Sequence, residues 1–331
     1  MKLRFAFAGF RHGHIFSLLA AARENPSIEV VALCEEDEAT RAQLVADGKL
    51  TPTHTSIAAM LAETECDVVA VGDYYGKRGR IVIDALKAGK HVISDKPLCT
   101  SLEELAEIEQ LAREKNLQVG LQLDLRDAGS MIALRDVIAS GEIGEVVTVN
   151  ITGQHPLSLG VRPAWYFVPG AHGGTINDIG IHAFDIIPWL TGHPVEKVLA
   201  ARSWNAKATE FPHFEDSAQL LARLTNGGGV LADFSYLAPT LCGFGEPNYW
   251  QITCHGLKGV ASTNYNADQV RVVTDTDAAP RYLPKAEAAQ SRYLADFLLC
   301  IEGRSDEAAL TTESILSVTR QALEAQAAAV G

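Results

Sequence analysis

Five short apolar runs, separated by helical patterns, occupy the first 121 residues and constrain the fold more than any other feature. The runs are LRFAFAG, IEVVALCE, CDVVAVGD, HVIS and LQVGLQL, and segments such as RGRIVIDALKAGK stand between them. Runs that are apolar on both faces are typical of a parallel sheet covered by helices on both sides. The pattern therefore predicts a doubly wound β/α domain over residues 1–121, with ligands bound at the carboxyl ends of its strands.

The pattern changes from residue 122 onward. A helical segment, SMIALRDVIASGEIG, is followed by strand-like runs separated by turn signals such as TNGGG and CHGLKG, and residues from about 286 onward are helical again. We expect strands near 145–153, 197–204, 217–225, 228–236, 248–254, 259–265 and 269–275. Residues 122–331 are thus predicted to form an α/β domain with a large, mostly antiparallel open sheet. Few helices remain to cover its second face, so we expect a homo-oligomer that pairs through this sheet.

Composition narrows the classes of partner and compartment. The 331 residues are 47% hydrophobic, and 41 acidic residues exceed 28 basic ones. This excess repels polyanions, so we expect a small-molecule substrate rather than nucleic acid or a membrane. The six cysteines show no Cys-x-x-Cys spacing, and no apolar run approaches the length of a membrane span. The apolar start could resemble a secretory leader, but Arg11, His12 and His14 interrupt it. A cytoplasmic protein with reduced thiols is the expectation.

The stretch AGFRHGH, residues 8–14, stands where a dinucleotide-binding enzyme has its glycine-rich loop. A strand that ends in glycine before a helix gathers backbone N–H groups into an anion site. Arginine stands at the usual middle glycine, where its guanidinium could lie beside phosphate. We expect the loop to bind a diphosphate, although it could be a simple strand-to-helix turn with an exposed arginine; the loop residues are Gly9, Phe10, Arg11, His12 and Gly13.

An acidic residue at the end of the second strand gives the loop its context. Glu35 follows the glycines by about two dozen residues, where a carboxylate would bind the adenosine ribose. The same carboxylate would repel a 2′-phosphate, which favours NAD, while Arg11 leaves NADP possible. The other interpretation is that residues 35–37 are the polar end of a strand and the start of a helix.

The segment HVISDKPLCT places Lys96 beyond a parallel strand, at the edge where open α/β sheets bind ligands. An ammonium there can hold a substrate hydroxyl and stabilise the alkoxide as hydride leaves. Pro97 restrains the backbone, and the bond before it could be cis. The alternative is a solvated surface lysine.

A second candidate constellation lies in GGTINDIGIHAFDIIPWLTG. Asp178, His182 and Asp185 follow at spacings of four and three, which places them on one helical face. A histidine between carboxylates is suited to accept a hydroxyl proton near neutral pH. Two other interpretations are a core histidine satisfied by Asp185 and a metal site. Because no obvious third ligand is present, no metal is predicted.

These segments, with CEED, ALKAGKHVISDKPLCTSLEE and GEIGEV, follow one another over nearly the whole chain and resemble the Gfo/Idh/MocA family of oxidoreductases. The resemblance implies a Rossmann domain, a second domain whose open sheet pairs into dimers or tetramers, and hydride exchange between NAD(P) and a hydroxyl-bearing carbon of a sugar, inositol or related polyol. Lys96 matches the family's lysine before proline, and Asp178 and His182 match its Asp-x-x-x-His pair. In these roles His182 exchanges the proton, Asp178 orients it or binds substrate, and Lys96 polarises the reacting oxygen.

The chain departs from the family pattern in the segment GDYYGKR and at two acidic positions. Tyr75 and Arg78 take places that commonly line the nicotinamide, and Asp95 replaces a glutamate. We expect these residues, together with Asp73, to contact the cofactor. Asp124 stands where arginine is frequent in the family.

The segment GQHPLSLGVRPAWYF precedes the catalytic residues, and we expect it to line the substrate pocket, since aromatic faces and bidentate donors suit a polyol or a carboxylated sugar. Packing of loop aromatics against the helix is the alternative. Two other functions stay open: an enzyme with tightly bound NAD that acts by transient oxidation, and a non-catalytic regulator that senses nucleotide or sugar. The presence of both Lys96 and His182 favours an enzyme. The predicted substrate-binding residues are Asp124, His155, Arg162, Trp165, Tyr166 and Asp178.

Overall fold

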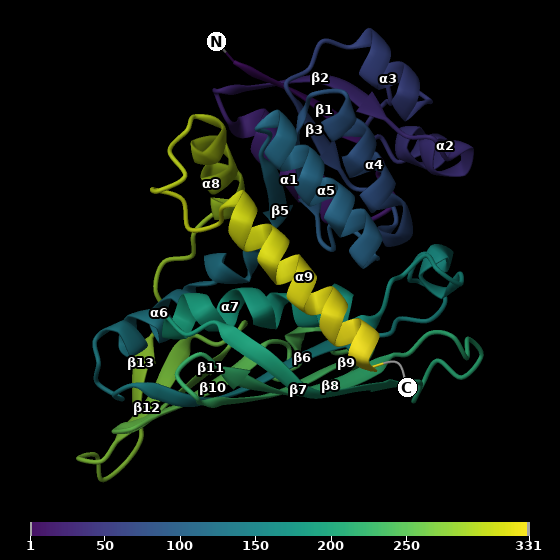
Figure 1. Ribbon diagram of the computed structural model, residues 1–331. Coiled ribbons are helices and arrows are strands. Elements are labelled where there is room, and N and C mark those ends of the chain that lie inside the picture. The colour runs from purple at the N-terminus through teal and green to yellow at the C-terminus, as the bar shows by residue number, and fades with distance from the viewer. Residues whose placement is uncertain (1, 330–331) are drawn as a thin grey trace. The chain divides into compact units, whose positions relative to one another are not determined.

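A computed structural model describes residues 2–329, and the chain divides into two compact units. The first unit comprises the residues up to 122 together with 170–173 and 293–320. The second unit comprises residues 123–169, 174–292 and those from 321 onward. Figure 1 shows the elements of each unit in the colours of the chain.

The first unit is built on a five-stranded sheet in the order β2-β1-β3-β4-β5, in which every pair is parallel. Every residue of β3 is buried, as are the last four of β1, because helices cover both faces. Along the chain, successive strands are added on one side of β1 and then, from β3 onward, on its other side. Rossmann sheets bind ligands at this switch point between β1 and β3. The predicted Rossmann architecture is confirmed, with strands β1 (Leu3–Ala8), β2 (Ile28–Cys34), β3 (Val68–Val71), β4 (His91–Asp95) and β5 (Val119–Gln122).

The helices of the first unit begin where side chains can cap them. Asp37, Ser56 and Ser101 each accept a hydrogen bond from a backbone N–H in the first turn of α2, α3 and α5 respectively. The helix that follows the Asp-Lys-Pro segment is α5. The helices are α1 (Ile15–Glu24), α2 (Glu38–Ala46), α3 (Ile57–Glu63), α4 (Tyr75–Lys87), α5 (Leu102–Lys115) and α8 (Arg292–Ile301).

The second unit contains an eight-stranded sheet in the order β13-β12-β11-β10-β6-β9-β8-β7. Of its pairs, β6 and β9 are parallel and the others are antiparallel, which confirms the predicted large, mostly antiparallel sheet. Helices α6 (Gly129–Ala139) and α7 (Ile181–Thr191) pack on one face. The strands are β6 (Val146–Pro156), β7 (Val195–Trp204), β8 (Ser217–Leu224), β9 (Gly229–Ala238), β10 (Gln251–Gly256), β11 (Gly259–Asn264), β12 (Gln269–Thr274) and β13 (Arg281–Pro284).

Two elements differ from the sequence-based expectation. The edge strand β13 was not predicted, because its four residues RYLP are too short to show alternation and end in proline. The helical tail is two helices, α8 and α9 (Thr312–Ala329), separated by a polar segment. Within residues 2–329, no helix is long and apolar enough to cross a membrane.

Candidate active site

The glycine loop after β1 leaves room for close backbone approach. Gly9 has φ +84°, and a Cβ there would lie 2.6 Å from Cβ of Asp73, so a side chain at this position would collide with the end of β3. A Cβ on Gly13 would meet no heavy atom within 4 Å. The ends of β1 and β3 are thus packed tightly while the loop in front of α1 is open. This geometry fits a dinucleotide, whose diphosphate would be held by the loop's N–H groups.

Two predicted ligands of the cofactor lie in unexpected surroundings. The Arg11 guanidinium lies over the Tyr74 ring, 4.9 Å from its centroid. Glu35 is fully buried, and its oxygens accept hydrogen bonds from the backbone N–H groups of Phe10, at 2.6 Å, and Asp37, at 2.9 Å. Burial raises the pKa of Glu35 despite these bonds. The carboxylate therefore ties the end of β2 to the glycine loop; its contact with ribose stays a prediction.

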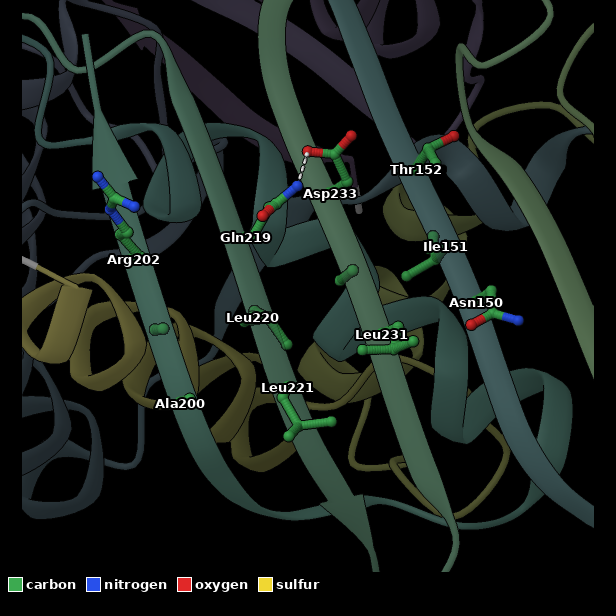
Figure 2. Close-up of a pocket in the computed structure, with 12 residues that line it drawn as sticks. Asn150, Ile151, Thr152, Ala200, Arg202, Gln219, Leu220, Leu221, Leu231 and Asp233 are labelled. Atoms are coloured by element: carbon green, nitrogen blue, oxygen red, sulfur yellow. Dashed lines mark hydrogen bonds between the residues drawn. The ribbon is translucent and has the colours of Figure 1, made fainter.

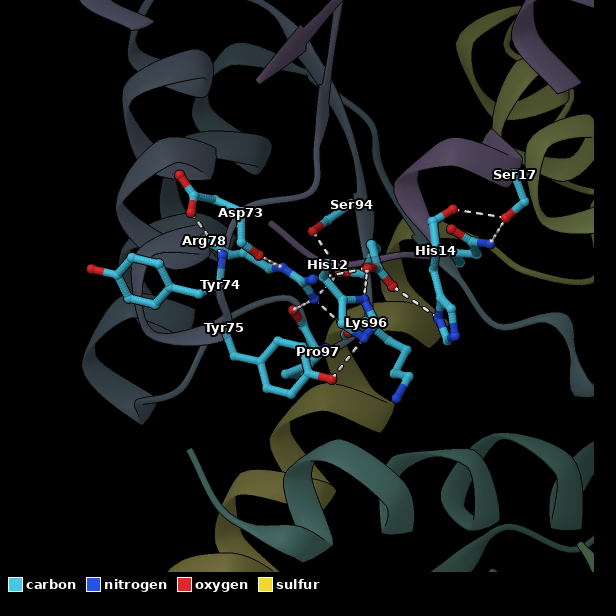
Figure 3. Close-up of polar contacts among 12 residues, drawn as sticks. His12, His14, Ser17, Asp73, Tyr74, Tyr75, Arg78, Ser94, Lys96 and Pro97 are labelled. Carbon is cyan, nitrogen blue, oxygen red and sulfur yellow. Dashed lines mark hydrogen bonds and ion pairs between the residues drawn. The ribbon is translucent and has the colours of Figure 1, made fainter. Parts of the chain in front are cut away.

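Arg78 is completely buried, and its guanidinium donates to several oxygen atoms of the protein (Figure 3). Its Nε donates to the Asp73 carbonyl at 2.7 Å, and Nη2 donates to the Asp95 carboxylate at 2.8 Å. Nη1 donates to the carbonyl oxygens of Asp95, Lys96 and Pro97. The planar guanidinium, with its fork of donors, thereby holds three consecutive residues of the Asp-Lys-Pro segment. Its expected contact with the nicotinamide stays untested, but the guanidinium clearly positions the segment that carries Lys96.

The Asp95 carboxylate also joins this segment to the glycine loop. His12 Nδ1 bonds to Asp95 Oδ2, and the Tyr75 hydroxyl lies 3.1 Å from His12 Nε2. Desolvation lowers the pKa of His12 to about 4, although the Asp95 charge opposes the shift. Arg78 and His12 hold the pKa of Asp95 well below its usual range in spite of its burial. A neutral imidazole that donates through Nδ1 and accepts at Nε2 satisfies both neighbours.

The same histidine and carboxylate groups are of the types that bind metal ions. His12, His14 and Asp95 have ligand atoms within 4.8 Å of one another. However, Arg78 already neutralises Asp95, and a divalent cation would have to compete with that buried ion pair. The arrangement therefore favours a hydrogen-bonded network over a cation site.

Lys96 lies at the end of this network and is 4% exposed. The peptide bond that joins it to Pro97 is cis. Its Nζ lies 5.9 Å from the centroid of the Tyr75 ring, so the ammonium is close to an aromatic face. A buried lysine at the carboxyl edge of a Rossmann sheet differs from the solvated surface lysine that was the alternative interpretation.

In the second unit, Asp178 and His182 are both buried. Asp178 lies in a π-helical turn, Ile176–Gly180, that leads into α7, so the expected uniform α-helical face is interrupted there. The Tyr236 hydroxyl, from β9, donates to Asp178 Oδ2, and the His182 ring lies 4.9 Å from Trp250. Burial and the Asp178 charge raise the pKa of Tyr236 well above its usual value, so the phenol keeps its proton. Sequence reasoning missed both aromatic residues, since their contacts are distant in the chain.

Asp185 is paired with an arginine inside the second unit. Arg126 Nε lies 3.0 Å from one carboxylate oxygen of Asp185, and its Nη2 donates to the other. Both side chains are at least nine-tenths buried, so the pair is a bidentate internal ion pair. Arg126 was absent from the predicted site, and its separation of 59 residues from Asp185 gives no local signal.

The predicted substrate residues gather in an aromatic part of the second unit. The His155 ring has edge contacts with Tyr249 and Trp250 at 5.1 and 5.5 Å between centroids. The Arg162 guanidinium lies 4.5 Å from the Tyr166 ring centroid, and its Nε and Nη2 donate to backbone carbonyls. Trp165 stacks on Tyr166 with 4.1 Å between centroids. These residues pack against one another as aromatic rings and also carry hydrogen-bond donors, so their contacts fit both the substrate-pocket interpretation and the packing alternative.

Asp124 lies in a 3₁₀ turn that follows β5, Asp124–Asp127. Its charge contributes to raising the pKa of Tyr249 and of Tyr265, for which burial is the larger cause. Asp124 therefore lies near the aromatic residues around His155, and its contact with substrate stays a prediction.

Comparison with protein families gives two matches that together span most of the chain. Residues 3–123 match the model described as an oxidoreductase family with an NAD-binding Rossmann fold, and residues 131–262 match the GFO/IDH/MocA C-terminal domain. A 1,5-anhydro-D-fructose reductase from Ensifer adhaerens is 29% identical over 176 residues, which is 53% of each chain. The match thus spans about half the length of that relative.

Solved structures agree in fold. One from Erwinia carotovora atroseptica has a TM-score of 0.88 at 22% identity and covers 99% of both chains. An inositol dehydrogenase homolog from Azotobacter vinelandii, complexed with NADH and myo-inositol, has a TM-score of 0.80 at 17% identity; the match covers 99% of this chain and 96% of that one.

Proposed function

The chain belongs to the Gfo/Idh/MocA family of oxidoreductases, and from this membership we propose that it exchanges a hydride between NAD and a hydroxyl-bearing carbon of a sugar, inositol or related polyol. The observation that carries the proposal is the buried group of Asp178, His182 and Tyr236 in the second unit. Burying ionisable groups costs free energy, and such groups cluster at functional sites. The reductase from Ensifer and the myo-inositol complex from Azotobacter support this class of substrate.

The proposed roles follow from the chemistry of each side chain. Bound NAD⁺ supplies the hydride acceptor. When a substrate alcohol is oxidised, its C–H bond gives up a hydride with both electrons, and the hydroxyl loses a proton. His182 accepts that proton, and Asp178 orients substrate or imidazole while Tyr236 fixes the carboxylate. Lys96 donates a hydrogen bond to the reacting oxygen and stabilises its developing negative charge.

The experiment that tests this proposal has two stages. Thermal unfolding with NAD, with NADP and without nucleotide shows which dinucleotide binds, since a ligand that binds the native state raises Tm. Purified protein is then assayed with a panel of polyols and aldoses at the nicotinamide absorbance. We expect stabilisation by NAD and turnover with at least one cyclic polyol or sugar. If nucleotide binds but no member of the panel reduces NAD, the result would favour one of the two other functions: a non-catalytic regulator, or an enzyme with tightly bound NAD that acts by transient oxidation.

We also infer that the sheet of the second unit pairs with a second copy of this chain. Its face opposite α6 and α7 presents a shallow hollow of about 510 Å³, lined by residues of β6, β7, β8 and β9 (Figure 2). Leu221 and Leu231 are directly paired across β8 and β9 and are 41% and 57% exposed. Exposed apolar side chains that adjoin one another on an open sheet face mark a candidate interface.

Leu231→Asp should weaken this association and shift the protein toward the monomer, because two copies would bring buried carboxylates together in an apolar interface. Multi-angle light scattering after gel filtration gives the mass. Leu257, 65% exposed in the turn between β10 and β11, offers the matched control, and Leu257→Asp should retain the wild-type mass. Equal masses for wild type and Leu231→Asp would exclude this face as the interface.

A further inference from the structure

We propose that the ion pair between Glu36 and Lys77 discriminates NAD from NADP. Lys77 could bind a 2′-phosphate, but its pairing with Glu36 prevents it from doing so. The inference rests on the proposed function in that NAD is the cofactor. It assigns the selectivity to residues that were not among the predicted ligands.

The location follows from the Rossmann sheet. In such domains, an acidic residue at the end of the second strand faces the adenosine ribose. Glu36 follows β2 and Lys77 lies in the first turn of α4, after β3, so both occupy the carboxyl edge of the sheet. The hydrogen bond from Phe10 to Glu35 shows that this end of β2 adjoins the glycine loop.

The neighbouring Glu35 is poorly suited to contact ribose. It has no exposed surface, and its two oxygens accept bonds from the backbone of Phe10 and Asp37. Glu36, by contrast, has a side chain that is 34% exposed. The accessible carboxylate at this edge is therefore the second of the two glutamates.

Lys77 bridges two carboxylates. Its Nζ lies 2.9 Å from Glu36 Oε2 and 2.8 Å from Asp73 Oδ2. Asp73 is fully buried, and Glu36 is anchored through Oε1, which accepts a bond from the Ile57 N–H. Burial opposes the charged form of Glu36, yet the bond from Lys77 and that N–H lower its pKa. The carboxylate thus stays ionised at neutral pH.

The balance of charge decides the selectivity. Two carboxylates and one ammonium leave the triad of Glu36, Asp73 and Lys77 with a net charge of about −1, which repels a phosphate of similar sign. Neutralising Glu36 leaves one ammonium and one buried carboxylate, so the Lys77 ammonium, whose side chain is 26% exposed, can donate to phosphate. Two further cations lie near this edge: Arg11, which lies over Tyr74, and Arg41, whose Nη1 donates to the carbonyl oxygens of Glu35 and Glu36.

The test measures binding and needs no substrate. Isothermal titration gives Kd for NAD⁺ and NADP⁺ with wild type, Glu36→Gln, Glu36→Gln/Lys77→Met and Glu35→Gln. Glutamine at 36 retains the acceptor for the Ile57 N–H and removes the charge. We expect Glu36→Gln to shift the ratio of the two Kd values toward NADP⁺ by about tenfold or more, the change that one charge-assisted hydrogen bond supplies. Adding Lys77→Met should cancel that gain.

Glu35→Gln is the matched control. Its amide would face the N–H groups of Phe10 and Asp37, so both Kd values should rise together while their ratio stays unchanged. Thermal melts establish that each variant is folded. An unchanged ratio in Glu36→Gln would overturn the proposal, and so would an equal shift in Glu35→Gln. A gain that survives Lys77→Met would transfer the role to another cation such as Arg11.

These outcomes are separable from failure of the proposed function. If wild type binds neither dinucleotide, both proposals fall. If it binds NAD⁺ and the variants behave as expected, but no polyol or sugar is oxidised, the selectivity stands and the proposed reaction does not.

Discussion

Alanine at Lys96 or at His182 should lower kcat/KM for the oxidised polyol by about 10³-fold or more, while the Kd of NAD changes little. Each side chain is proposed to act on the reacting hydroxyl, and loss of an acid–base or charge-stabilising group typically costs 10²- to 10⁴-fold. Because the loss occurs in the transition state, kcat should fall more than KM rises.

Steady-state kinetics and nucleotide titration on the same preparations measure both effects. His193 and Lys258 lie outside the proposed site, so His193→Ala and Lys258→Ala provide controls of the same residue types and should behave like wild type. A kcat within tenfold of wild type in either Lys96→Ala or His182→Ala would remove that residue from the chemistry.

The free energy of unfolding should decrease by up to about 3 kcal/mol through His12 as the pH falls from 6.5 to 4. Burial lowers the pKa of His12 to about 4 in the folded protein, against 6.5 for an exposed histidine. Between these values the unfolded chain binds a proton that the folded chain does not, so acid favours unfolding. Above pH 6.5 both states are neutral at this residue and the effect is absent. The charged or titratable groups that face His12 are Tyr75, Arg78, Asp95 and the His14 imidazole.

His12→Asn isolates this contribution, since asparagine can still donate to Asp95 and cannot titrate. Urea unfolding at a series of pH values should show a shallower dependence for the variant, with the difference confined to the range between 6.5 and 4. Parallel curves for the two proteins would show that His12 is not the group responsible.

The fold could be predicted because its signals are local. The buried strands β1 and β3 are continuous apolar runs, and Ser101 caps α5 from the adjacent position. Such patterns depend on neighbours in the chain. The strand β13 escaped prediction because its pairing with β12, and not its four-residue sequence, stabilises it.

The candidate site was predicted less completely, because its partners come from distant segments. Lys96, Asp178 and His182 could be predicted as site residues because their residue types and local motifs indicate acid–base chemistry. The bond from Tyr236 to Asp178 spans 58 residues, and the ion pair of Arg126 with Asp185 spans 59. No spacing rule links such pairs, and only the fold brings them together.

Adjacent acidic residues were also beyond sequence reasoning. The sequence favoured Glu35 as the ribose ligand, and that contact stays a prediction. The bond from the Phe10 N–H to the buried Glu35 carboxylate, and the partial exposure of Glu36, could not be read from the order of the two residues.

The clamp formed by Arg78 has a consequence for engineering coenzyme preference. Arg78 fixes residues 95–97, and the next residue toward the N-terminus, Lys77, belongs to the triad with Glu36. A substitution at Lys77 therefore lies next to Arg78, the residue that supports the segment carrying Lys96. Glu36 lies on a separate loop, between β2 and α2, so substitutions there leave that support unchanged.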